Sequence, residues 1–264
     1  VVTLSYSRDQ FVYPAFDQKL ETVIAGLEAA WHYFGGVVAR AIIDNLKPAI
    51  LKADAQDPVV NPAFLEYAES RGFFVDAARA RRPKDKPRVE NQVRFVRQSW
   101  FRGETFTDVH HMRREATDWC SNVAGQRCHG TTRRKPREVL VTEDRPHLRP
   151  VPAEPFDIPT WTTAKAHPDH HIQIKKALYS VPTQYVGREV RVRTDSQLVR
   201  IYWRGDAIKT HSLVPPGARR TDINDYPEHK RPYAARSAQT IRTRARDLAP
   251  VIGEFVDRLL YDPM

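Results

Sequence analysis

The fold is decided by residues 35–47, GGVVARAIIDNLK, where a mainly apolar run stands between a glycine pair and an Asp-Asn pair. Four of the seven residues in Val37–Ile43 are β-branched, and Arg40 is the one charged residue of the run. This composition predicts a buried strand of the kind found in parallel sheets. The glycines and Asp44-Asn45 are turn signals that bound it. We therefore expect an α/β domain in which Asp44 directly follows a buried strand.

The sequence on either side of this strand predicts the other elements of the domain. They are a hairpin of two strands (1–6 and 11–14), helices at 17–31, 62–70 and 88–101, and a strand at 73–75. Asp17 is a candidate cap of the first helix. The last helix has an apolar face made by Val89, Val93, Val96 and Trp100. This alternation of strands and helices is typical of an α/β domain with a mixed sheet.

The carboxyl-terminal half has a different pattern. A helix is expected at 107–123, and the proline-rich stretch 136–159 predicts an extended tether between domains. Short alternating strands then predict a small antiparallel barrel or meander; they are residues 171–180, 188–194, 198–204 and 207–213. The tail, residues 234–261, is predicted to be helical with a break near Pro250.

Basic residues are concentrated in the middle of the chain. Residues 79–137 contain 16 basic and 6 acidic side chains, whereas residues 1–78 contain 6 basic and 10 acidic ones. The formal net charge of the chain is +10, and 31 of its 42 basic residues are Arg. Because Arg pairs bidentately with phosphate, this distribution indicates a polyanion partner, with nucleic acid as the first candidate. An Arg-rich proteome is the alternative explanation.

Composition also bears on the cellular location. No stretch approaches the roughly 18 consecutive apolar residues of a membrane helix, and the amino-terminal residues lack the pattern of a signal peptide. Two cysteines, Cys120 and Cys128, are too few for a disulfide framework. We therefore expect a cytoplasmic protein, and because the first residue is Val1, we expect the natural start to lie upstream.

Two carboxylates have positions suited to metal-ion catalysis. Asp44 follows the apolar strand, and Glu90 lies in the first turn of the predicted helix 88–101. Ligands gather at the carboxyl ends of strands in α/β sheets, and carboxylate oxygens are ligands that Mg²⁺ prefers. A pair of such ions can carry phosphoryl transfer, but holding both needs at least three carboxylates. A turn cap at Asp44 and a favourable helix-dipole contact at Glu90 are the structural alternatives.

The residues around both carboxylates resemble the integrase/transposase superfamily, and within it the large transposase of the IstA type. The matching stretches are LSYSR (4–8), IDNLK (43–47), KPRVEN (86–91), Asn122 with HGTT (129–132), and PRE (136–138). The resemblance implies that Asp44 and Glu90 are the second and third acidic residues of a D-D-E triad. The first would lie on a strand before the hairpin, so the chain begins too late to include it, and Asp9 in the hairpin turn is no substitute.

The resemblance also implies a domain organisation. It comprises a partial RNase H-like core without its first strand (1–105), a helix and basic proline-rich linker (106–159), a small antiparallel β-barrel like the Mu transposase C-terminal domain (160–215), and a proline-rich segment with a helical tail (216–264). The implied reaction is metal-dependent 3′-end cleavage and strand transfer, with two Mg²⁺ or Mn²⁺ ions in the complete enzyme. Asp44 and Glu90 would be the catalytic metal ligands in this chain.

The same resemblance implies partners. They are the DNA of transposon ends and targets, further copies of the chain, and a helper ATPase of the IstB type, with no membrane and a location in the cytoplasm at the nucleoid. The candidate DNA-binding residues are Lys84, Lys86, Arg88, Arg94, Arg97, Arg133 and Arg134. For the first five, which flank Glu90, a solvated helix face is the structural alternative.

The sequence also allows other functions and sites. A chain without the full acidic set could be a catalytically inactive DNA-binding remnant, and the barrel could bind RNA. Zinc is not expected, because Cys120 and Cys128 are further apart than paired zinc ligands. His170-His171 is expected in a polar loop. Tyr202-Trp203 could stack on bases, but we expect one of the two in the core and the other outside.

The tail carries a regular apolar seam. Its residues are spaced alternately by four and three positions: Ile241, Ala245, Leu248, Ile252, Phe255 and Leu259. An amphipathic tail after a proline-rich segment could bind a groove on a partner. The resemblance makes the helper ATPase the first candidate and another transposase protomer the second. Packing of the tail on the barrel is the structural alternative.

Overall fold

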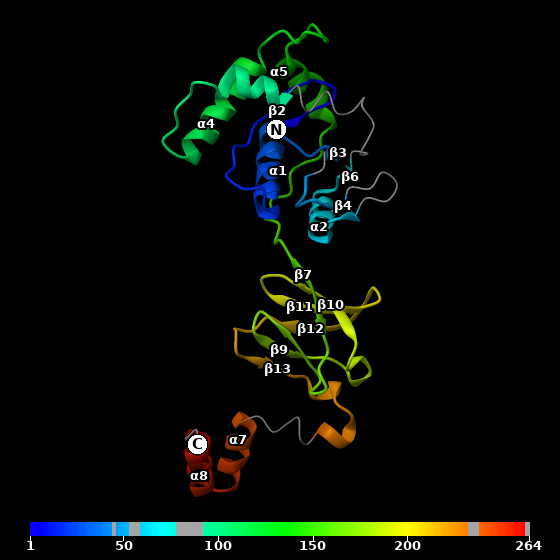
Figure 1. Ribbon diagram of the computed structural model, residues 1–264, viewed down its shortest axis with the longest axis vertical. Coiled ribbons are helices and arrows are strands. Elements are labelled where there is room, and N and C mark those ends of the chain that lie inside the picture. Colours follow the sequence, from blue (N-terminus) through cyan, green and yellow to red (C-terminus); the bar gives the residue numbers. More distant parts are fainter. Residues whose placement is uncertain (44–45, 53–58, 78–91, 232–237, 262–264) are drawn as a thin grey trace. The chain divides into compact units, whose positions relative to one another are not determined.

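The computed structural model describes residues 1–43, 46–52, 59–77, 92–231 and 238–261, and the chain divides into two compact units (Figure 1). The first unit is Val1–Ile158 and the second is Pro159–Met264. Each unit has a buried apolar core of its own. Among the described residues, no helix has the length and apolar character needed to cross a membrane.

The first unit begins with the predicted hairpin and helix. Strands β1 (Val2–Thr3) and β2 (Gln10–Phe11) pair antiparallel, and helix α1 (Leu20–Phe34) follows. The strands are shorter than predicted because the chain already turns at Leu4, whose amide donates to the Asp9 carbonyl at 2.9 Å. Asp17 is not the cap of α1, since the helix begins after Lys19; the Asp17 carboxylate instead accepts from the Lys19 amide at 3.1 Å.

The apolar run forms strand β3 (Arg40–Ile43), which pairs in parallel with β6 (Phe74–Ala77). In the sequence, three elements stand between these two strands: the short antiparallel pair β4 (Ile50–Lys52) and β5 (Val59–Val60), and the predicted helix α2 (Pro62–Arg71). The parallel strand is confirmed, but its predicted burial is wrong, because the side chain of Ile42 is 60% exposed. Phe74 on β6 is 73% exposed as well, so the pair presents one face to solvent. Val37, before the strand, is the fully buried part of the run.

Helices α1 and α2 bury aromatic side chains against each other. Trp31 and Tyr67 are almost completely buried, and the Trp31 indole Nε1 donates to the Tyr67 hydroxyl at 3.0 Å. Beside them, the buried Arg71 Nε pairs with Glu28 at 2.7 Å, and its Nη2 donates to the Glu154 carbonyl at 3.1 Å. The contact with Glu154 joins the end of the first unit to its helical core.

Part of the stretch predicted as an extended tether is folded into the first unit. Residues 136–147 form α5 (Pro136–Val139), the π-helical turn η3 (Leu140–Asp144) and the 3₁₀ turn η4 (Arg145–His147). Leu140 is fully buried in the core of the first unit, and Arg149 exchanges backbone hydrogen bonds with Val37 at 2.8 and 2.9 Å. The proline content was misleading because Pro136 occupies the first turn of a helix, where proline is tolerated.

We expect Gly36→Ala to destabilise the first unit. A Cβ at Gly36 would lie 2.5 Å from the Leu148 Cβ and 2.7 Å from the Arg149 carbonyl oxygen, so the two backbones would have to separate. Overpacking of this kind costs about 1–3 kcal/mol, measurable by urea unfolding. Gly130→Ala is the matched control, because a Cβ there meets nothing within 4 Å. Equal stability of the two variants would contradict the close approach.

The remaining helices of the first unit form a satellite core. Residues 92–96 are helical and continue into the π-helical turn η1 (Arg97–Phe101), while α4 (Val109–Trp119) continues into η2 (Cys120–Ala124). Trp100 and Trp119 stack at 6.1 Å between ring centroids. Both predicted helices are therefore confirmed over the described residues, although Val93 is exposed and Val89 lies outside the described residues.

The second unit contains two small sheets. One has the strand order β12-β11-β10-β7 and is antiparallel; its strands are β7 (Thr160–Lys165), β10 (Glu189–Thr194), β11 (Leu198–Trp203) and β12 (Asp206–Ser212). The other has the order β13-β9-β8; its strands are β8 (His171–Ile174), β9 (Ala177–Ser180) and β13 (Arg219–Arg220). Three predicted strands are confirmed, whereas 171–180 is a hairpin of two. Among the described residues no ladder joins the two sheets, so the strands do not form the single closed barrel that was expected.

The end of the chain is helical, as predicted. Two 3₁₀ turns, η6 (Ile223–Asp225) and η7 (Glu228–Lys230), precede helices α7 (Ala238–Leu248) and α8 (Pro250–Tyr261). The predicted break falls at Pro250, which begins α8, a position where proline is favoured.

Candidate catalytic edge and nucleic-acid interface

Strands β3 and β6 end together at one edge of their sheet. They run in parallel with Ile43 opposite Ala77, so the chain leaves both strands on the same side. Asp44 directly follows Ile43 in the sequence, and the basic stretch that contains Glu90 follows Ala77. Asp44, Glu90, Lys84, Lys86 and Arg88 all lie outside the described residues. The structure therefore describes this edge of the sheet, and only the sequence relates the two carboxylates to it.

The starts of the same two strands are held by the segment that follows α5. Gly35 and Gly72 end α1 and α2 in the left-handed conformation, with φ of 85° and 75°, so that each helix turns sharply toward its strand. Arg145 Nε donates to the Phe34 carbonyl at 3.1 Å, and Arg149 donates to the Gly72 carbonyl. Two arginines thus bind the last carbonyls of both helices and fix the entry into the parallel pair.

A buried ion pair joins the hairpin to α5. The Asp9 side chain has no exposed surface, and its Oδ2 lies 3.3 Å from Arg137 Nη1, while its Oδ1 accepts from the Gln10 amide at 2.9 Å. Burial raises the pKa of Asp9, and the Arg137 charge opposes that shift. The Arg137 guanidinium lies over the Tyr33 ring at 4.6 Å, so it has both ionic and aromatic partners.

The described candidates for DNA contact differ in how free their charges are. Arg94 and Arg97 are exposed on a helical stretch whose other side buries Val96 and Trp100. In the loop before α5, Arg133 is exposed with φ of 55°, whereas Arg134 forms an ion pair with Glu143, which also accepts from the Tyr6 hydroxyl.

Other arginines of the basic segment support the fold. The guanidinium of Arg127 lies 3.6 Å from the Phe95 ring centroid, and that of Arg113 lies 4.1 Å from the ring centroid of Tyr13. Burial lowers the pKa of Arg127. The sequence count of basic residues therefore overstates the charge that is open to a polyanion.

One face of the four-stranded sheet adds an aromatic and basic patch that sequence reasoning missed. Trp161 on β7 and Tyr202 on β11 lie 5.3 Å apart between ring centroids, and the exposed Arg191 on β10 lies 4.8 Å from the Trp161 ring. Register brings them together, because Arg191 is directly opposite Tyr202. Trp203 packs against the core of the second unit, so the expectation that one member of Tyr202-Trp203 is inside is confirmed.

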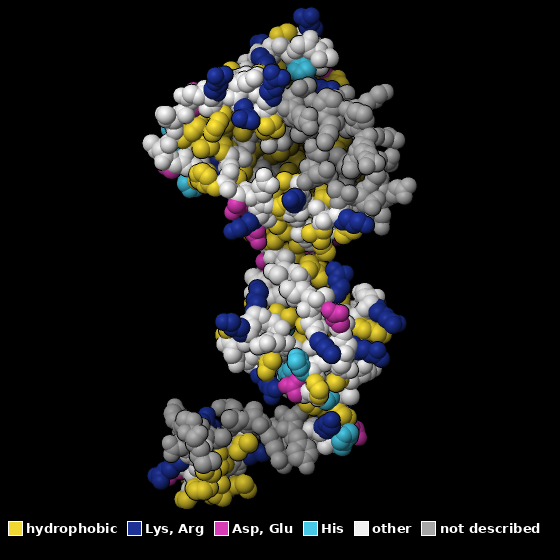
Figure 2. Space-filling model, viewed as in Figure 1, with side chains coloured by type: hydrophobic (Ala, Val, Ile, Leu, Met, Phe, Trp, Pro, Cys, Tyr) yellow, Lys and Arg dark blue, Asp and Glu magenta, His cyan; other side chains and the backbone are white. Residues whose placement is uncertain are grey.

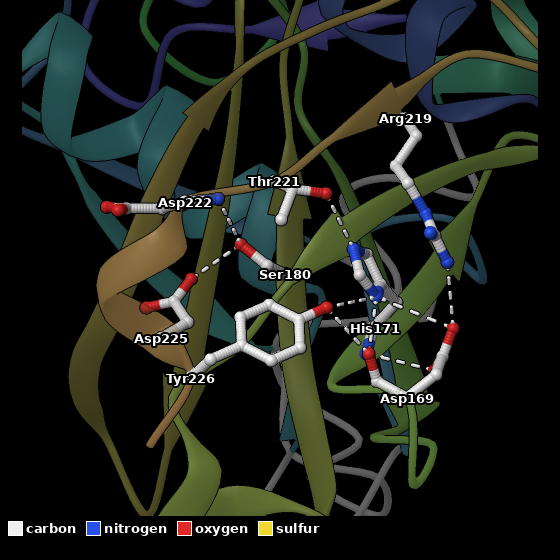
Figure 3. A network of polar contacts seen from close by, with 8 residues as sticks. All are labelled: Asp169, His171, Ser180, Arg219, Thr221, Asp222, Asp225 and Tyr226. Atoms are coloured by element: carbon white, nitrogen blue, oxygen red, sulfur yellow. Dashed lines mark hydrogen bonds and ion pairs between the residues drawn. The ribbon is translucent and has the colours of Figure 1, made fainter. Parts of the chain in front are cut away.

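A second polar cluster of the second unit has the residue types of a catalytic site (Figure 3). The Ser180 hydroxyl donates to Asp225 Oδ2 at 2.5 Å and accepts from the Asp222 amide at 2.8 Å. Lys209 Nζ bridges Asp222 and Asp225 at 2.6 and 2.7 Å. Burial alone would lower the pKa of Lys209, but these two carboxylates raise it. Because Ser180 is fully buried and its hydroxyl proton is donated to Asp225, the cluster ties the segment after β13 to β9 rather than exposing a nucleophile.

The histidines of the same cluster are also structural. His171 is buried, and its two ring nitrogens contact the Asp169 carbonyl at 2.7 Å and the Thr221 hydroxyl at 2.9 Å, as Figure 3 shows. Burial lowers the pKa of His171, which favours the neutral ring. His170 is buried and stacks on Tyr226 at 4.4 Å. The expected loop is therefore confirmed for His170, which precedes β8, and wrong for His171, which begins the strand. Both rings are buried and have partners on the segment after β13, far along the sequence.

The chain is similar to transposases of insertion sequences. Residues 151–223 match the family described as Mu transposase, C-terminal domain. A Mycobacterium tuberculosis protein whose name describes it as a transposase is 34% identical over 261 residues, which cover 97% of this chain and 63% of that protein. The transposase for insertion sequence element IS21 of Pseudomonas aeruginosa is 31% identical over 235 residues, covering 88% of this chain and 59% of that protein. This chain thus spans about three fifths of the length of these relatives.

Proposed function

Because nearly the whole chain is homologous to insertion-sequence transposases, we propose that it is part of a DNA transposase of the IstA type, which cuts the 3′ ends of its element and joins them to target DNA. The similarity over 97% of the chain is the observation that carries this proposal. The match of residues 151–223 to the family described as Mu transposase, C-terminal domain, also supports it, because most of that stretch lies in the second unit.

The proposed catalytic core is RNase H-like and lies in the first unit. The parallel pair β3–β6, with helices α1 and α2 beside it, supports an α/β core in which a carboxylate follows a strand end. In this proposal Asp44 and Glu90 hold the metal ions, together with an acidic residue upstream of Val1. Arg145 and Arg149 act as positioning residues, since they fix the entry of both strands rather than contact DNA.

The donor chemistry of these residues fits the implied metal. Both Asp44 and Glu90 offer carboxylate oxygens, which suit Mg²⁺ or Mn²⁺. Two bound metal ions would activate the attacking oxygen and stabilise the leaving oxygen. The protein's own contribution is to hold the DNA phosphates in line, for which Lys84, Lys86, Arg88, Arg94 and Arg97 are the proposed residues.

The proposed partners follow from the same assignment. They are transposon-end and target DNA, further copies of the chain and a helper ATPase of the IstB type, acting in the cytoplasm at the nucleoid. The patch of Arg191, Trp161 and Tyr202 supports a second DNA contact, because a guanidinium and aromatic rings suit phosphate and bases respectively.

We expect DNA affinity to depend steeply on salt through the basic segment. Each lost phosphate contact should make the log–log salt slope shallower by roughly 0.9 on duplex DNA. Replacing Arg81, Arg82, Arg133 and Arg134 with Gln should weaken binding and flatten the slope in fluorescence-anisotropy titrations. Within this set, Arg133→Gln should flatten the salt slope more than Arg134→Gln does, because Glu143 already neutralises the charge of Arg134.

The matched control for this titration replaces four exposed lysines outside the segment with Gln, which removes the same number of charges: Lys19, Lys175, Lys176 and Lys230. It should leave the slope unchanged. A slope that responds equally to both sets would mean that net charge, and not a localised interface, determines binding. A slope that responds to neither would place the DNA contact elsewhere.

A further inference from the structure

Helices α7 and α8 contact each other through small residues and ion pairs. Ala245 is buried on α7, and a Cβ at Gly253 of α8 would lie 2.4 Å from the Arg246 Cγ, so the helices approach closely there. Asp257 pairs with Arg242 at 3.1 Å and with Arg246 at 2.7 Å. This contact leaves most of the large apolar side chains of the tail outside it.

Those side chains form an exposed patch, visible in yellow on the tail helices in Figure 2. Their exposed fractions are large: Leu248 77%, Val251 76%, Phe255 62%, Leu259 62% and Ile252 44%. On α8 they recur three or four residues apart and therefore share one side of the helix. An apolar patch of this kind, bordered by charged residues, marks a protein-binding surface.

The charges beside the patch indicate what covers it. Residues 238–261 contain four basic and three acidic side chains, so the tail lacks the strong positive charge of the middle segment. Glu254 and Arg258 are exposed one turn apart on the same flank of the α8 stripe. When two such helices pair antiparallel about a two-fold axis, residues of the same flank meet, and Glu254 of one copy comes beside Arg258 of the other. The flank is therefore complementary to itself in charge.

We propose that two copies of this chain associate through the tail, with α8 of one antiparallel to α8 of the other and the two-fold axis near Phe255. The interface is isologous, because the same patch is used on both sides. Leu248, Val251, Phe255 and Leu259 form its apolar centre, and two Glu254–Arg258 pairs border it. This assignment concerns assembly and is independent of the catalytic role of Asp44 and Glu90.

The test is a charge-reversal series on the whole chain, with mass measured by sedimentation equilibrium at micromolar concentration. The unaltered chain should dimerise. Glu254→Arg places Arg opposite Arg, and Arg258→Glu places Glu opposite Glu, so each variant alone should dimerise at least about tenfold more weakly. Mixing the two variants restores both opposite-charge pairs, and the mixture should form a heterodimer as strong as the unaltered dimer.

The controls separate assembly from folding. Glu69→Arg makes the same charge change at an exposed position of α2 and should not alter the dimer. Circular dichroism should show equal helix content in all variants. A monomeric unaltered chain, a mass that does not respond to either reversal, or a mixture that stays as weak as its components would each overturn the proposal. The first result points to a different protein on the patch, and the second places the dimer interface elsewhere on the chain.

Discussion

Asp44→Asn or Glu90→Gln is expected to reduce strand transfer by at least about 10³-fold, in a protein that carries the residues upstream of Val1. Each change removes the negative charge of a proposed metal ligand, and metal-ion catalysis supplies several kcal/mol of transition-state stabilisation. Since each 1.36 kcal/mol is a factor of ten in rate, a loss of about 4 kcal/mol gives this magnitude. The measurement is joining of labelled element ends to plasmid DNA in Mg²⁺.

The matched controls are Asp118→Asn and Glu69→Gln, which make the same chemical changes at exposed helix positions. They should retain full activity. DNA binding by the Asp44 and Glu90 variants should be nearly normal, because the phosphate contacts belong to basic residues. Full strand transfer by either site variant would end its assignment as a ligand, and loss of DNA binding together with activity would indicate a structural role instead.

Arg137→Met is expected to destabilise the first unit by about 3 kcal/mol at neutral pH. The change leaves the fully buried Asp9 carboxylate without its positive partner, and breaking a buried pair costs roughly 3–5 kcal/mol. We expect the lower end of this energy range because the Arg137 side chain is 24% exposed, so solvent weakens its attraction to Asp9. Urea unfolding at several pH values measures it.

The pH dependence has a definite sign. Burial already raises the pKa of Asp9 above its ordinary value of 3.8, and losing the Arg137 charge raises it further. A folded state that holds this proton more tightly than the unfolded state loses stability as pH rises from the unfolded pKa through the folded pKa. The cost of Arg137→Met should therefore be small near pH 4 and grow toward pH 7.

Two variants test whether the Asp9 charge causes this pH dependence. Asp9→Asn together with Arg137→Met removes the titrating group and should abolish the extra pH dependence. Lys135→Met removes an exposed pair with Glu138 and should cost less than about 1 kcal/mol at every pH. A destabilisation by Arg137→Met that is constant with pH would mean that lost packing on Tyr33, and not the Asp9 charge, is responsible.

Elements were predictable where local periodicity and turn residues agreed. The α2 helix begins at Pro62, directly after Asn61, and ends before Gly72, so the sequence signals both of its caps. The Asn61 side chain does accept from the Ala63 amide at 3.0 Å. The hairpin between β8 and β9 was missed for the opposite reason. Its turn uses Lys175 and Lys176 with φ of 48° and 64°, a conformation for which lysine gives no signal.

Features that depend on distant contacts were not predictable. The burial of His170 and His171 depends on Thr221 and Tyr226, and nothing near the histidines indicates those partners. The Trp161, Arg191 and Tyr202 patch depends on strand register in the same way. At the proposed catalytic edge, the sequence motifs place Asp44 after β3 and Glu90 in the first turn of a helix. The parallel register of Ile43 and Ala77 adds that the chain leaves both strands at the same edge of the sheet.

The contacts of Arg145 and Arg149 with the ends of α1 and α2 have a consequence for synthesis of the protein on the ribosome. Arg145 lies 111 residues after the Phe34 carbonyl that it binds, and Arg149 lies 77 residues after Gly72. At about 5–20 residues per second, a ribosome needs roughly 6–22 s to synthesise the first of these intervals. During that time Trp31 and Phe34 are already outside the tunnel while the segment that completes their core is not. Nascent chains of this protein are therefore expected to need chaperone protection until Arg149 has emerged.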